Sequence, residues 1–102
     1  MNLIKHIERQ MEFSIETFGP GERSAGIVDH IKKELLEIEA NPLDLEEWID
    51  IIILGIDGAW RSGHSASSIA TMLEFKQSKN ENRNWPDWRT GEPGKAIEHI
   101  RK

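Results

Sequence analysis

Two pairs of acidic residues, each with a spacing of three, are the best candidates for chemistry in this sequence. The first pair is Glu34 and Glu37, and the second is Glu47 and Asp50. Side chains at this spacing lie on one face of a helix, close enough to share a cation. Four carboxylates from two packed helices would form an oxygen-rich site, which suits Mg²⁺ better than zinc or copper. Pairs of this kind are also common as solvated surface charges, so both interpretations stay open at this point.

The elements that must position these pairs are helices. Apolar residues recur every three or four positions over long stretches, which is typical of amphipathic helices. Gly19-Pro20-Gly21 and Asn41-Pro42 separate the first three stretches. We expect four helices and a short last one, at residues 3–17, 24–40, 44–62, 65–83 and from about 94 to the end. With no strand pattern, this order predicts an all-α protein: a single domain over residues 1–102 that forms a four-helix bundle with antiparallel neighbours.

The second predicted helix places a carboxylate among apolar side chains. At about 100° per residue, Glu34 falls inside the apolar stripe and Glu37 lies at its edge. The stripe consists of Ile27, Ile31, Leu35 and Ile38. A partly buried carboxylate must be hydrogen-bonded, paired or bound to a metal ion. His30, one turn before Glu34, either orients that carboxylate or is an ordinary surface histidine.

The third predicted helix carries an acidic row opposite a broad apolar face. The row consists of Glu47, Asp50, Asp57 and Arg61, interrupted by Leu54. The apolar face consists of Leu45, Trp48, Ile49, Ile52, Ile53, Ile56 and Trp60. Within this helix, the run Ile51-Ile52-Ile53-Leu54 is apolar on all sides, which predicts that the helix is buried on more than one side. The acidic row should therefore face another helix or subunit. Glu47 has a second interpretation, as the capping-box partner of Asp44.

Composition narrows the class of protein. The chain has 102 residues, a net charge of −5 and no cysteine. The charge argues against general nucleic-acid binding, and the lack of cysteine excludes disulfides and cysteine-based zinc sites. The polar first residues and the short apolar runs predict a soluble cytoplasmic protein with no membrane partner. A chain of this length can form only a small hydrophobic core with little stability to spare, which favours self-association.

Most of the chain resembles the MazG-like all-α nucleoside triphosphate pyrophosphohydrolases, in particular the dATP/dGTP diphosphohydrolase branch that is common in phages and prophages. The resemblance is carried by the segments TFGPG, HIKKELLEIEANPLDLEEWIDIIILGIDGAWRSG, KQSKNENRNWPDWR and KAIEHIR. Lys33 departs from the general pattern, which has a glutamate there. The resemblance implies that the magnesium ligands are Glu34, Glu37, Glu47 and Asp50, with Mn²⁺ as a substitute.

The resemblance also implies a reaction and its further residues. Nucleoside triphosphates, preferentially purine dNTPs such as dGTP or dATP, would be cleaved to the monophosphate and pyrophosphate. Glu37, or else Glu34, would take a proton from the attacking water. Lys76, Asn80 and Arg83 match a phosphate-contacting motif, and their spacings of four and three put them on one helix face. Candidates to contact the base or sugar are Phe13, Phe18, Trp60 and Asp57. Relatives assemble as dimers or tetramers, and a phage-encoded member would act in the host cytoplasm.

Three other classes compete with this interpretation. The first is a non-enzymatic helical module that binds a partner through its acidic face. The second is a di-iron bundle, which typically needs Glu-x-x-His pairs that neither acidic pair supplies. The third is a helical nucleic-acid binder, which the net charge disfavours. Magnesium-dependent hydrolysis of a nucleotide would distinguish the enzyme from all three.

Overall fold

The computed structural model describes residues 1–101 and is all-α, with four α-helices and no strand in that range, as predicted. The helices are α1 (Leu3–Phe18), α2 (Ser24–Ala40), α3 (Leu45–Arg61) and α4 (Ala66–Glu81). Their bounds agree with the predicted ranges to within two residues. The described chain forms two compact units, Met1–Thr71 and the part from Met72 onward.

The helix ends follow from local sequence. Asn2 precedes α1, and its side chain accepts a hydrogen bond from the Lys5 amide at 3.1 Å. Asp44 precedes α3 and accepts one from the Glu46 amide at 3.0 Å. Such side chains satisfy amide groups that have no partner within the helix. After α3, Gly63 takes a φ of 102°, which favours glycine over any residue with a side chain.

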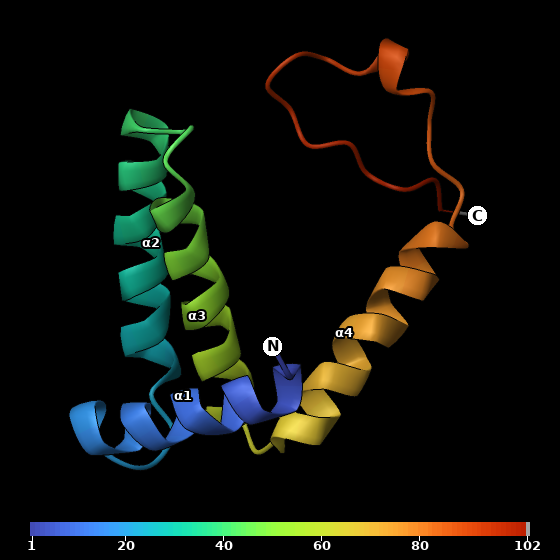
Figure 1. Cartoon of the computed structure of the whole chain (residues 1–102). Coiled ribbons are helices and arrows are strands. Elements are labelled where there is room, and N and C mark those ends of the chain that lie inside the picture. The colour runs from blue at the N-terminus through green and yellow to red at the C-terminus, as the bar shows by residue number, and fades with distance from the viewer. Residues whose placement is uncertain (102) are drawn as a thin grey trace. The chain divides into compact units, whose positions relative to one another are not determined.

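In the first unit, α2 and α3 lie side by side, and α1 crosses them near the start of α2 and the end of α3 (Figure 1). The short turn between α2 and α3 makes them antiparallel neighbours. Two side chains attach α1 to the second half of α3. Gln10 Nε2 donates to the Ile53 carbonyl at 2.7 Å, and Ser14 Oγ donates to Asp57 Oδ2 at the same distance. This arrangement leaves the first half of α3 to face α2.

The face of α3 that is buried is the polar row, as predicted. Leu54, Asp57 and Arg61 are the buried residues of α3, whereas Trp48 and Ile52 on the apolar face are about half exposed. Charged side chains tolerate this burial because they are paired with each other or hydrogen-bonded. Leu35 departs from the predicted stripe of α2, since 47% of its surface is exposed. The apolar face of α3 thus exposes several large side chains, among them Trp48 and Ile52.

The predicted last helix from about residue 94 does not form. Residues 95–101 are non-helical, and the only regular element that the structure describes after α4 is a single 3₁₀ turn, Trp88–Thr90. The segment instead returns to the end of α4, where the Ile100 amide donates to the Asn84 carbonyl at 2.7 Å (Figure 1). A helix of so few residues is marginal in water. The hydrogen bond to Asn84 favours a non-helical path over the predicted helix, and the local sequence pattern does not reveal this contact.

No helix within the described residues is long and apolar enough to cross a membrane.

Candidate functional site

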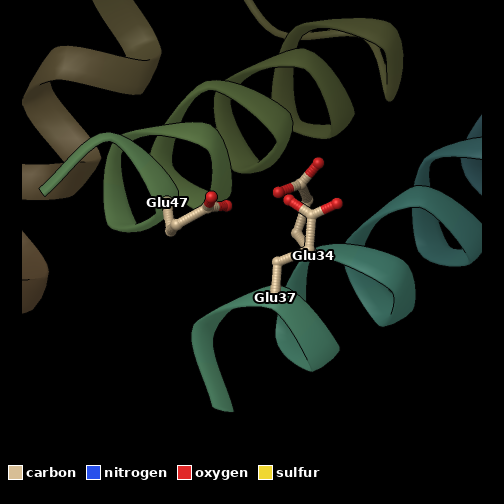
Figure 2. Close-up of side chains that lie close together, drawn as sticks. All are labelled: Glu34, Glu37 and Glu47. Carbon is tan, nitrogen blue, oxygen red and sulfur yellow. The ribbon is translucent and has the colours of Figure 1, made fainter. Parts of the chain in front are cut away.

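Three of the four predicted metal ligands come together between α2 and α3. Glu34 and Glu37 extend from α2 toward α3, and Glu47 extends from the start of α3 toward them (Figure 2). One carboxylate oxygen of each lies within 4.8 Å of the others. We call Glu34, Glu37 and Glu47 the acidic cluster. The spacing of three along α2 and the antiparallel turn after it are what bring these side chains to one place.

The acidic cluster contains carboxylate oxygens that the protein leaves without partners. Only 9% of the Glu34 surface is exposed, and Glu47 is half-buried. The Oε2 atoms of both are buried and accept no hydrogen bond. A buried acceptor without a donor is costly, and a cation with hard oxygen ligands would remove that cost. The residues therefore fit Mg²⁺ or Mn²⁺.

The surroundings of Glu47 in the acidic cluster raise its pKa. The pKa of Glu47 is raised to about 7, chiefly because it shares a hydrogen bond with Glu37, with further contributions from burial and from the negative charges of Glu37, Glu34 and Asp44. A divalent cation would neutralise the negative charges of Glu37, Glu34 and Asp44, which are the electrostatic part of this shift.

The raised pKa predicts a pH dependence of stability in metal-free protein. The Glu47 carboxyl keeps its proton up to about pH 7 when folded and loses it near 4.5 when unfolded. The folded state therefore binds more protons between these values, so raising the pH through this window lowers the free energy of unfolding. Urea denaturation in the presence of a chelator should show the urea midpoint falling from pH 4.5 to pH 7. Glu47→Gln should flatten this slope, whereas Glu46→Gln should keep it; an equal slope in both variants would contradict the assignment.

Glu47 is not engaged in helix capping. In a capping box its carboxylate would accept from the Asp44 amide, but that amide donates to the Asn41 carbonyl at 3.1 Å. Asp44 caps α3 through the Glu46 amide instead. The capping-box interpretation of Glu47 is therefore wrong, and its carboxylate belongs to the acidic cluster.

Asp50 lies outside the acidic cluster. The group of mutually close carboxylates does not include it, although it is only one turn along α3 from Glu47. Its side chain lines a neighbouring pocket that Glu34 also lines. A role for Asp50 as a fourth ligand stays a prediction.

His30 lies beside Glu34 at the surface, which fits both interpretations considered for it. Its Nε2 lies 3.3 Å from Glu34 Oε1, while about half of the His30 side chain is exposed. The other oxygen of Glu34, Oε2, is buried without a partner.

A pocket of about 270 Å³ adjoins the acidic cluster within the first unit. Phe13, Phe18 and Asp57, three of the four residues predicted to contact base or sugar, line it, and Trp60 does not. The two phenylalanine rings stand edge to face at 6.4 Å between centroids, and the Arg23 guanidinium lies over Phe18. These apolar surfaces beside a few polar groups are typical of ligand sites.

Asp57 and Trp60 belong to a buried hydrogen-bonded network. Asp57 Oδ2 accepts from Ser14 and Oδ1 accepts from Trp60 Nε1 at 2.8 Å. Arg61 donates to Ser14 Oγ at 2.9 Å and to the Gly21 carbonyl at 2.8 Å. Both carboxylate oxygens of Asp57 are thus occupied, and the network fastens the Gly19–Gly21 turn to α3. Ser14 and Asp57 of this network line the pocket.

Ser14 and Gln10 are among the pocket residues that sequence reasoning missed. Gln10 Nε2 is fixed by the Ile53 carbonyl, and its Oε1 is buried without a partner. Only the position of Asp57 four residues before Arg61 hinted at a buried pair on α3. Nothing in the sequence points to the partners on α1, which lie more than forty residues away.

The predicted phosphate-contacting residues lie together in the second unit. Arg83 donates to Asn80 Oδ1 at 3.0 Å. The pKa of Lys76 is lowered, first by the positive charge of Arg83, then by burial and by Lys79. The positive charges of Arg83 and Lys79 thus lie close enough to Lys76 to disfavour its protonated form.

Comparison with known proteins identifies the family. No curated protein and no solved structure is significantly similar to the chain. The model of the dATP/dGTP pyrophosphohydrolase family matches residues 6–102, which include the acidic cluster, the pocket and the basic residues after Met72. The chain therefore belongs to the dATP/dGTP pyrophosphohydrolases, and it is a nucleoside triphosphate diphosphatase.

Proposed function

We propose that the chain hydrolyses purine deoxynucleoside triphosphates, dGTP or dATP, to the monophosphate and pyrophosphate in a reaction that depends on Mg²⁺. The observation that supports this most directly is the acidic cluster, with two buried carboxylate oxygens that have no partner. Family membership supplies the substrate class. A dNTP substrate also favours the cytoplasm as the place of action, or the host cytoplasm if a phage encodes the chain.

The proposed ligands of Mg²⁺, or of Mn²⁺ in its place, are Glu34, Glu37, Glu47 and Asp50. When bound, the metal ion lowers the pKa of a water ligand and neutralises phosphate oxygens. Glu37 is the first candidate to accept the proton of the attacking water, because its side chain is exposed at the edge of the cluster. Glu34 is the second candidate, since it is buried and one of its oxygens, Oε1, already lies 3.3 Å from His30 Nε2.

Lys76, Asn80 and Arg83 are the proposed contacts to phosphate. Lysine and arginine side chains bind phosphate oxygens through charge-assisted hydrogen bonds. The Asn80 side chain accepts from Arg83, which orients the guanidinium. The lowered pKa of Lys76 supports this role, since an anion beside Arg83 and Lys79 would relieve the repulsion that causes it.

The pocket beside the acidic cluster is the proposed site of the base and sugar. Phe13 and Phe18 offer apolar ring surfaces, and most of its lining is apolar. The buried Oε1 of Gln10 is an acceptor for an N–H group of a purine. Trp60 supports this site indirectly, through its hydrogen bond to Asp57.

We also propose that the chain forms a dimer or tetramer. The apolar face of α3 exposes several large side chains along its length, among them Trp48, Ile49 and Ile52. Contiguous apolar surface of this kind usually marks an interface. A second copy that covers this face would enlarge a core that is small for a chain of 102 residues.

A panel of nucleoside triphosphates tests the proposed reaction. The purified protein is incubated with each of the dNTPs and NTPs in Mg²⁺, and pyrophosphate is separated from orthophosphate. Pyrophosphate and monophosphate in equal amounts, with dGTP or dATP turned over fastest, is the expected result. Chelation of the metal should reduce the rate by at least about 100-fold. Release of orthophosphate alone would contradict cleavage between the α- and β-phosphates.

A further inference from the structure

The segment after α4 returns to the end of that helix and brings His99 and Arg101 near the proposed phosphate-contacting residues. The Ile100 amide donates to the Asn84 carbonyl, so residues 99–101 lie beside the end of α4. Trp85 connects the two parts. Its Nε1 donates to the Asn80 carbonyl at 2.7 Å, and its ring meets the His99 imidazole edge-on at 5.9 Å between centroids. His99 thus contacts Trp85, which is hydrogen-bonded to Asn80, the partner of Arg83.

The groups gathered here are mostly cationic. The pKa of His99 is lowered by burial first, and then by the positive charges of Arg83, Arg101 and Lys76, with Glu98 opposing them. The charged groups around the imidazole are therefore three cations and one carboxylate. Within the described residues, none of these three cations forms a salt bridge. Such uncompensated charge is typical of a site for a polyanion.

We propose that His99 and Arg101 complete an oligophosphate site with Lys76 and Arg83. This rests on the proposed function, in which the last two contact the phosphates of the nucleotide. Neutral or protonated, the imidazole can donate an N–H to a phosphate oxygen, and Arg101 can offer a guanidinium fork.

Binding of inorganic pyrophosphate to the full chain tests the site directly. His99→Phe keeps an aromatic ring against Trp85 but removes the N–H donors. It should weaken pyrophosphate binding, measured by calorimetry, by about tenfold and raise KM for dGTP by a similar factor with a smaller change in kcat. Arg101→Gln changes an exposed side chain and should act in the same direction. Circular dichroism should show unchanged helix content in both variants.

Arg89→Gln is the matched control, since it removes one positive charge from the same unit. Arg89 already pairs with Asp87 at 3.0 Å and lies outside this group. It should leave both pyrophosphate affinity and KM unchanged; equal losses in Arg89→Gln and Arg101→Gln would show a general charge effect and overturn the proposal.

The His99 imidazole supplies a readout that a merely structural role would not move. A bound polyanion offsets the charges of Lys76, Arg83 and Arg101, so pyrophosphate should raise the pKa of His99 in an NMR titration. No rise on addition of pyrophosphate would overturn the proposal, as would wild-type protein that does not bind pyrophosphate.

The outcomes separate this proposal from the proposed function. If dGTP is hydrolysed but His99→Phe and Arg101→Gln change neither pyrophosphate affinity nor KM, the reaction stands and the site is wrong. If no nucleotide is hydrolysed but pyrophosphate binding depends on both residues, the anion site stands without the reaction. Weaker pyrophosphate binding with an unchanged KM would assign the site to a free anion and overturn its role in substrate binding.

Discussion

Glu37→Gln is expected to lower kcat for dGTP by about 100-fold or more, the usual range for loss of a general base. Glutamine keeps the size of the side chain but cannot accept a proton from water, and it is a weaker ligand for a hard cation. The Glu37 side chain lies at the exposed edge of the acidic cluster, so the substitution should not unfold the protein. Steady-state kinetics at saturating Mg²⁺, with circular dichroism to follow helix content, measure the effect.

Glu39→Gln is the matched control for this prediction. Glu39 is exposed on the same helix, two residues further on, and is not part of the acidic cluster. It should leave kcat within about twofold of the wild-type value, because a solvated surface charge at this distance is largely screened. If Glu37→Gln kept full activity, Glu37 would be neither a ligand nor the base. Affinity for Mn²⁺ in the same variant separates these two roles, since loss of a ligand weakens metal binding and loss of a base alone does not.

The helices and the acidic cluster were predictable because both depend on local spacing. Glu34 and Glu37 share a face of α2 whatever surrounds it, and a four-residue connection leaves α3 no choice but to return along α2. The position of Glu34 in an apolar stripe predicted its burial, which the structure confirms. The sequence could not reveal which oxygens would lack partners, because that depends on side-chain contacts such as the one from His30.

Contacts between residues far apart in the chain could not be predicted from the sequence. The partners of Asp57 and Arg61 on α1 depend on where α1 crosses α3, and no period in the sequence encodes that crossing. Residues 95–101 are a second example. KAIEHIR has a helical pattern, yet the Ile100–Asn84 hydrogen bond and the Trp85–His99 contact place it differently. In both cases tertiary contacts decide over local propensity.

The second large effect is expected from the buried ion pair of α3. Arg61→Met should lower the free energy of unfolding by about 3–5 kcal/mol, because it leaves the Asp57 carboxylate buried without a compensating charge. The two side chains are 1% and 9% exposed, with Arg61 Nε 3.7 Å from Asp57 Oδ2. The variant also loses the hydrogen bonds to Ser14 and to the Gly21 carbonyl. Urea denaturation followed by circular dichroism measures the change.

Arg89→Met is the comparison that isolates burial. Its ion pair with Asp87 has a better distance, 3.0 Å, but the side chains are 70% and 49% exposed. Its loss should cost no more than about 1 kcal/mol. Similar losses in Arg61→Met and Arg89→Met would show that the network around Arg61 contributes no more than a surface pair.

The double variant Asp57→Leu/Arg61→Met distinguishes an uncompensated charge from lost packing. Removal of both charges eliminates the buried carboxylate that makes the single variant costly, so the double variant should be more stable than Arg61→Met alone. It still lacks the bonds that fasten the Gly21 turn to α3 and Asp57 to Ser14. Phe18 and Arg23, on either side of that turn, line the pocket. We therefore expect the double variant to regain stability relative to Arg61→Met. Its KM for dGTP should nevertheless be higher than that of the wild type. This pair of results would mean that the buried pair shapes the nucleotide pocket and does not stabilise the fold.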